Sequence, residues 1–147
     1  MDLNLKIEAL FDKDTKEAYY NLLLLEQLSE TTNKLYPYFY DFFEMIHSEK
    51  YVVRVRGYRL LCKQAKWDNE NRINEILDEL LAHIEDEKPT AVRQKIKSLE
   101  DIVPYKKELN DKIKKVALSI DCSRFKDTMS PLITKDIQNL VGLIEAQ

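Results

Sequence analysis

Residues 35–46 read LYPYFYDFFEMI, and residues 73–84 read INEILDELLAHI. The two stretches place apolar side chains at the same relative positions, which are Leu35, Tyr38, Phe39, Phe42, Phe43 and Ile46 in the first and Ile73, Ile76, Leu77, Leu80, Leu81 and Ile84 in the second. Intervals of three and four residues put such side chains on one face of an α-helix. A helical pattern that returns about every 35 to 40 residues predicts stacked helical hairpins, each of which buries its apolar face only against its neighbours.

The rest of the chain can also be divided into pairs of helical segments. We therefore predict an all-α fold, a right-handed α-solenoid of about four helical hairpins that forms one domain over residues 1–147. Two glycines and four prolines in 147 residues leave few helix breakers. The predicted hairpins pair residues 2–11 with 15–30, 33–47 with 51–67, 70–85 with 89–103, and 105–120 with 130–145. The approximate repeats are then 2–30, 33–67, 70–103 and 105–145.

Helix starts have local support at three places. Asp14 is the expected N-cap of the helix over 15–30. Pro89 and Pro131 fall in the first turns of two other predicted helices, where a missing N–H costs nothing.

The second helix of each hairpin has a pattern of its own, with apolar or small residues at relative positions 0, +4 and +7. These are Ala18, Leu22 and Leu25; Val53, Gly57 and Leu60; Val92, Ile96 and Leu99; and Ile133, Ile137 and Leu140. In the two central helices an arginine, Arg54 or Arg93, follows the first of these residues. Both arginines lie among predicted core positions, where an unpaired charge is costly.

The Val-Arg pair, with a small residue and a leucine downstream as at Gly57 and Leu60, resembles the second-helix motif of the HEAT-repeat (armadillo-like) family. Pro37 is similar to the proline that often bends the first helix of such repeats. The order of this proline and of the two Val-Arg pairs along the chain also resembles small bacterial HEAT-like proteins. The resemblance implies that the second helices line a concave side. It also implies that Arg54 and Arg93 are structural and pair with acids or helix-end carbonyls between adjacent repeats.

The best candidate for a binding surface is a set of four cations, Arg56, Arg59, Lys63 and Lys66, which we name the basic stripe. Their spacing places them on one narrow helix face opposite the predicted core, with Trp67 at its edge. If second helices line a groove, the stripe could hold an acidic peptide, a phosphate or a nucleic-acid backbone. The alternative is a solvated face whose charge is answered by the acidic stretch 68–87.

We expect a non-catalytic interaction or scaffold module that binds a protein or an acidic peptide on its second-helix face. The alternative is nucleic-acid binding through the stripe. Trp67 and Asp68 resemble the tryptophan and acid of HEAT-like DNA glycosylases that excise alkylated bases, but one such pair is not a catalytic set. We expect no enzyme, no cofactor and no metal site, because the titratable residues form no convergent motif.

Composition bounds the partners and the location. The net charge of −3 does not by itself imply a nucleic-acid or membrane partner. Acidic residues at the start do not fit a signal peptide, and no apolar run is long enough to span a bilayer. Cys62 and Cys122 are expected to be reduced thiols in a cytoplasmic protein. Atypical terminal repeats that can cap a stack predict a monomer.

Overall fold

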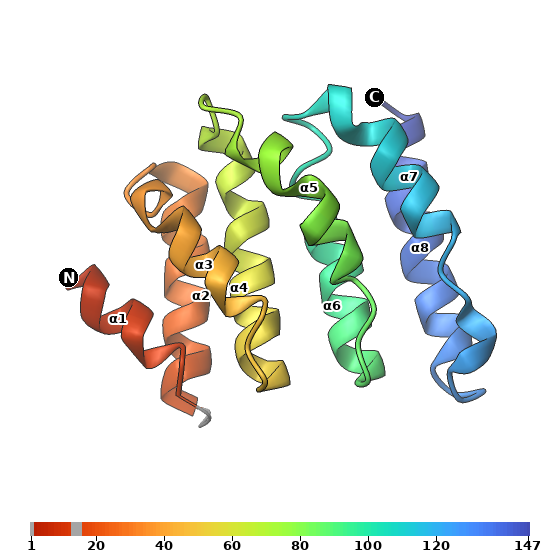
Figure 1. Ribbon diagram of the computed structural model, residues 1–147, viewed down its shortest axis with the longest axis horizontal. Coiled ribbons are helices and arrows are strands. Elements are labelled where there is room, and N and C mark those ends of the chain that lie inside the picture. The colour runs from red at the N-terminus through yellow and green to blue at the C-terminus, as the bar shows by residue number, and fades with distance from the viewer. Residues whose placement is uncertain (1, 13–15) are drawn as a thin grey trace. The chain divides into compact units, whose positions relative to one another are not determined.

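The structure is a computed structural model that describes residues 2–12 and 16–147, and these residues form helices and connecting turns without a strand (Figure 1). The predicted all-α class is therefore confirmed. The chain divides into two compact units, unit 1 over residues 1–68 and unit 2 over residues 69–147. Among the described residues, no helix combines the length and the apolar character needed to cross a membrane.

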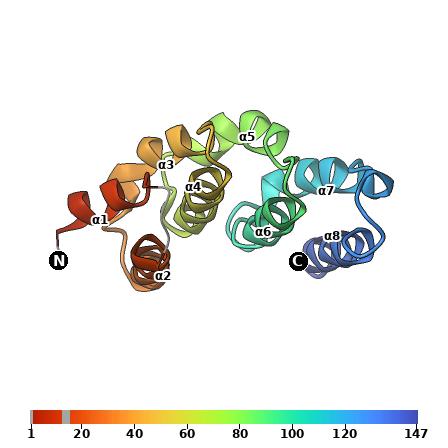
Figure 2. The same cartoon turned by 90° about the horizontal axis from the view of Figure 1, so that it is seen from below.

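Unit 1 contains two hairpins. The helices of the first are α1 (Leu3–Ala9) and α2 (Lys16–Thr31), and those of the second are α3 (Phe39–Met45) and α4 (Tyr51–Lys63). Short 3₁₀ turns precede α3 (Tyr36–Tyr38) and continue α4 (Gln64–Trp67). Within this unit, α1 and α3 lie in one layer, and α2 and α4 pack side by side in the other (Figure 2).

Unit 2 repeats this organisation. Its helices are α5 (Arg72–Ala82), α6 (Pro89–Leu99), α7 (Asn110–Leu118) and α8 (Ser130–Glu145). A 3₁₀ turn precedes α7 (Lys107–Leu109), and another leads toward α8 (Cys122–Arg124). Helix α8 packs against both α6 and α7.

All eight predicted helical segments contain a helix, although several helices are shorter than predicted. The segment 33–47 starts as a 3₁₀ turn around Pro37, and the α-helix begins only at Phe39. Helix α6 begins at Pro89 as predicted but stops at Leu99, before the predicted end at residue 103. The predicted cap Asp14 lies outside the described residues.

The two apolar helix faces predicted from the sequence pattern are buried, one in the core of each unit. Leu35, Phe39, Phe42 and Ile46 are fully buried in unit 1, and Ile73, Leu77, Leu80 and Ile84 are buried in unit 2. Flanking positions such as Tyr38, Phe43 and Ile76 are only half-buried. Complete burial of one such side chain contributes about 1.5–3 kcal/mol, so these two faces supply much of the stability of each unit.

Gly57 allows α4 to approach α3 closely. A Cβ at this position would lie 2.5 Å from Met45 Cβ and 2.7 Å from the carbonyl oxygen of Phe42. Gly142 in α8 is different, because a Cβ added there would meet no described atom within 4 Å. The small residue expected in the Val-Arg pattern is thus required in the second hairpin for close helix packing.

We expect Gly57→Ala and Gly142→Ala to change stability in opposite directions. The first should lower the free energy of unfolding by about 1–3 kcal/mol, because the new methyl group overlaps the backbone of α3. The second should raise it by about 0.5–1 kcal/mol, because alanine is the better helix former. Urea unfolding measures both, and an unchanged or more stable Gly57→Ala variant would contradict the close approach of α3 and α4.

Candidate functional site

The basic stripe faces helix α2. Arg59 donates from Nε to Glu26 Oε2 at 3.0 Å and from Nη2 to Glu26 Oε1 at 2.7 Å. Lys63 Nζ lies 2.5 Å from Glu30 Oε1, and Lys66 Nζ donates to the carbonyl oxygen of Glu30 at 2.6 Å. The stripe therefore joins α4 to α2. These three contacts are with the preceding hairpin, a partner that the sequence analysis did not name.

Arg56 does not lie on an exposed face, and the prediction for its position is wrong. Its side chain is buried, with 6% of the residue exposed. Its Nη1 donates to the carbonyl oxygens of Leu10 at 2.8 Å and Asp12 at 2.6 Å, just beyond the end of α1. The last carbonyls of a helix have no partner within the helix, and they form its negative end, so a guanidinium satisfies them well. The helical wheel missed this because it shows no neighbouring hairpin.

Trp67 and Asp68 lie at the end of the 3₁₀ turn that continues α4. Trp67 Nε1 donates to the carbonyl oxygen of Ser29 at 2.7 Å, and Lys66 Nζ lies 5.3 Å from the centroid of the indole ring. Asp68 is buried, with 5% exposed, and accepts a hydrogen bond of 2.6 Å from the Tyr36 hydroxyl. The pair that resembles glycosylase chemistry is thus engaged in contacts within unit 1.

The two arginines expected to be structural make different contacts. Arg93 binds Asp136 with both ends of its guanidinium, with Nε to Oδ2 at 2.7 Å and Nη2 to Oδ1 at 3.3 Å, and so joins α6 to α8. The hydrogen bond to Asp136 raises the pKa of Arg93. Arg54 Nη1 donates to the carbonyls of Ser48 at 2.9 Å and Glu49 at 3.0 Å, in the turn of its own hairpin. The family resemblance implied a partner of Arg54 in an adjacent repeat, whereas these two contacts lie within its own hairpin.

A recurring polar position in the second helices was missed. Three residues after Ala18, Val53, Val92 and Ile133 stand Asn21, Arg56, Lys95 and Asp136. Lys95 is 1% exposed and donates to the carbonyl oxygen of His83 at 2.7 Å and to Asp86 Oδ2 at 3.1 Å. Lys6 Nζ donates to Asn21 Oδ1 at 3.4 Å. An alignment of the four second helices would have revealed this position, because each helix has a polar or charged residue there.

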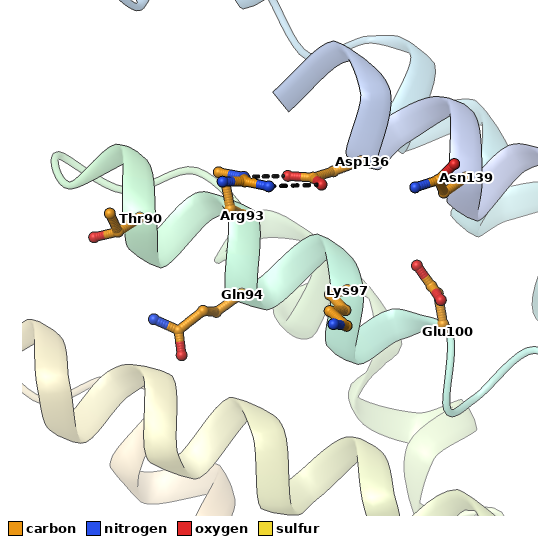
Figure 3. A pocket seen from close by; sticks show the side chains of 7 residues that line it. All are labelled: Thr90, Arg93, Gln94, Lys97, Glu100, Asp136 and Asn139. Atoms are coloured by element: carbon orange, nitrogen blue, oxygen red, sulfur yellow. Dashed lines mark hydrogen bonds and ion pairs between the residues drawn. The ribbon is translucent and has the colours of Figure 1, made fainter. Parts of the chain in front are cut away.

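Unit 2 has a groove of about 370 Å³ between α6 and α8 (Figure 3). It is lined by Thr90, Arg93, Gln94, Lys97 and Glu100 on the α6 side and by Asp136 and Asn139 of α8. Of these residues the sequence analysis singled out only Arg93. A signal was available, because Arg93, Lys97 and Glu100 are spaced by four and three residues and share one helix face.

Glu100 gives the groove its electrostatic character. It is the C-cap residue of α6 and is half-buried. Burial raises the pKa of its carboxyl group; the charge of Lys97 acts in the opposite direction, and Asp101 and Asp136 add to the rise. The lining side chains give the groove hydrogen-bond donors, hydrogen-bond acceptors and charges of both signs.

Comparison with known proteins does not assign a function to this chain. No protein-family model, curated protein or solved structure matches the chain. Membership of the HEAT-repeat family therefore stays a prediction. The function is inferred from the groove in unit 2 and from the contacts that the basic stripe makes with α2.

Substitution of Arg56 tests its structural role. We expect Arg56→Ala to lower the free energy of unfolding by about 2–4 kcal/mol, because two helix-end carbonyls lose a charged donor in a buried place. Lys66→Ala is the matched control from the same stripe, and since Lys66 is exposed its loss should be about 0.5 kcal/mol or less. Urea unfolding of both variants gives the comparison, and equal losses would refute the buried role of Arg56.

Proposed function

We propose that this protein is a non-catalytic interaction module that binds an extended polypeptide segment in the groove between α6 and α8. The observation that carries the proposal is a groove of about 370 Å³, lined by polar and charged residues of α6 and α8, two helices that the Arg93–Asp136 pair joins. The binding face expected from the sequence, that of the second helices, is kept in this proposal, but the proposed binding residues are those of the groove and not those of the basic stripe.

The lining chemistry suits a polypeptide. Main-chain amides present donors and acceptors in alternation, and the Asn139 amide and the Thr90 hydroxyl can each act as donor or acceptor. Both residues are exposed, so they are open to a ligand. A volume of about 370 Å³ lies at the small end of ligand sites, which fits a few peptide residues and not a folded domain.

We also propose that the four hairpins are HEAT-like repeats of one solenoid and that the chain acts as a monomer. The recurring polar position at Asn21, Arg56, Lys95 and Asp136 supports a common repeat, because one feature recurs at the same place in every second helix. We propose a cytoplasmic location, since Cys62 and Cys122 are both free thiols.

Selection of peptides tests the groove directly. Random 12-residue peptides displayed on phage should be enriched by the immobilised protein, and the enriched peptides should lose at least about tenfold in affinity on Asn139→Trp, because the indole fills the groove. Fluorescence anisotropy with the synthetic peptides measures the affinity.

Lys115→Trp is the matched control for this experiment. Lys115 is exposed on α7, outside the groove, so the same side chain there should leave peptide affinity unchanged. Failure to enrich any peptide, or equal affinity for the protein and its Asn139→Trp variant, would rule out the groove as the binding site.

The nucleic-acid alternative gains no support from the stripe, because Arg59, Lys63 and Lys66 bind α2. We expect the protein to flow through a heparin column at about 100 mM salt, where a track of free cations would be retained. Retention that is lost on the double substitution Lys63→Glu and Lys66→Glu would reverse this conclusion and favour nucleic acid.

A further inference from the structure

We propose that the groove of unit 2 receives a basic side chain of the bound polypeptide, an arginine or a lysine, and that Glu100 is its counter-charge. This inference rests on the proposed function and deepens it, because it names the feature of the peptide that the groove selects.

The carboxylate of Glu100 has no partner of its own. Among the described residues, no hydrogen bond or ion pair engages the side chain of Glu100, Lys97 or Asn139. Figure 3 shows the Glu100 carboxylate standing away from the end of α6, on the side where Asn139 of α8 lies. By contrast, Asp136 already accepts two hydrogen bonds from Arg93. One wall of the groove thus ends in an unpaired acid.

The surroundings of Glu100 leave a surplus of negative charge. Glu100 caps the C-terminal end of α6, where the helix dipole already places partial negative charge. Burial is the main factor that disfavours the charged form of Glu100; Lys97 acts against it, and Asp101 and Asp136 disfavour the charged form further. A carboxylate in this position is unfavourable in the free protein, and a cation bound beside it would remove that cost.

The geometry favours a basic side chain over a metal ion. Zinc and calcium need at least three or four protein ligands, whereas Glu100 is the one groove carboxylate that no arginine engages. A guanidinium needs a single carboxylate for a charge-assisted pair and has further N–H groups for a neutral acceptor. The side-chain amide oxygen of Asn139, on the opposite wall, can be that acceptor.

Reversal of the charge at residue 100 tests the inference. Peptides selected from random 12-residue phage libraries on the unchanged protein should share one arginine or lysine, and those selected on Glu100→Lys should carry aspartate or glutamate at that position. For the best synthetic peptide, Glu100→Gln should weaken binding roughly tenfold. Replacement of the peptide arginine by neutral citrulline should weaken it by the same factor, and the two changes together should add little more.

Asp111→Lys is the matched control. Asp111 is an exposed acid in the first turn of α7, outside the groove, so this change should alter neither the selected sequences nor the affinity. Selected peptides without a common basic residue, or an arginine peptide that binds Glu100→Gln with unchanged affinity, would overturn the inference and leave the proposed function standing. Absence of any enriched peptide on the unchanged protein would overturn both.

Discussion

The ends of short helices impose the constraint on which the rest of this structure depends. Helices α1 and α3 have seven residues each, so a large share of their carbonyl groups have no partner within the helix. Cations of the second helices bind carbonyls at or just beyond the ends of the first helices. Arg56 reaches the carbonyls of Leu10 and Asp12 beyond α1, Arg54 those of Ser48 and Glu49 beyond α3, and Lys95 that of His83 at the end of α5. Each contact joins a second helix to the end of a first helix or to the turn that follows it.

This use of cations limits what the basic residues can do for function. A side chain that holds a helix end or bridges two helices cannot also bind a ligand without a cost of several kcal/mol when the contact is buried. Arg56 is committed in this way, and Arg59 binds Glu26 with both arms of its guanidinium. A cluster of positive charge in a helical repeat sequence is therefore poor evidence for a ligand until the neighbouring helix is known.

The helices could be predicted from the sequence because their signal is local. Intervals of three and four residues mark the buried faces at Leu35–Ile46 and Ile73–Ile84, and a helix face depends only on the residues of that helix. Helix ends were less predictable, as the early end of α6 at Leu99 shows.

The candidate site could not be predicted in the same way, because its contacts join residues far apart in the chain. The partner of Arg59 lies in α2, 33 residues earlier, and Asp136 follows Arg93 by 43 residues. A wheel drawn for one helix assigns Arg56 and Lys95 to the solvent side, since it contains no information on the helix that covers them. The groove depends further on where α6 stops, which is a property of the turn after Leu99 and not of the periodic pattern.

A comparison of the second helices of the two units shows how the α6–α8 pair differs from the α2–α4 pair. In unit 1, the pairs Arg59–Glu26 and Lys63–Glu30 fill the space between α2 and α4. When α2 is aligned with α6 on Ala18 and Val92, and α4 with α8 on Val53 and Ile133, the residues that correspond to Glu26 and Arg59 are Glu100 and Asn139.

Asn139 carries no charge, so it cannot form with Glu100 the ion pair that Arg59 forms with Glu26. The residues that correspond to Lys63 and Glu30 are Leu143 and Pro104, which cannot form an ion pair either. At these two positions α6 and α8 are therefore not bridged by charge, and Glu100 and Asn139 line the groove. The exchange of an arginine in α4 for an asparagine in α8 thus leaves the groove acid without the cation that its counterpart in unit 1 binds.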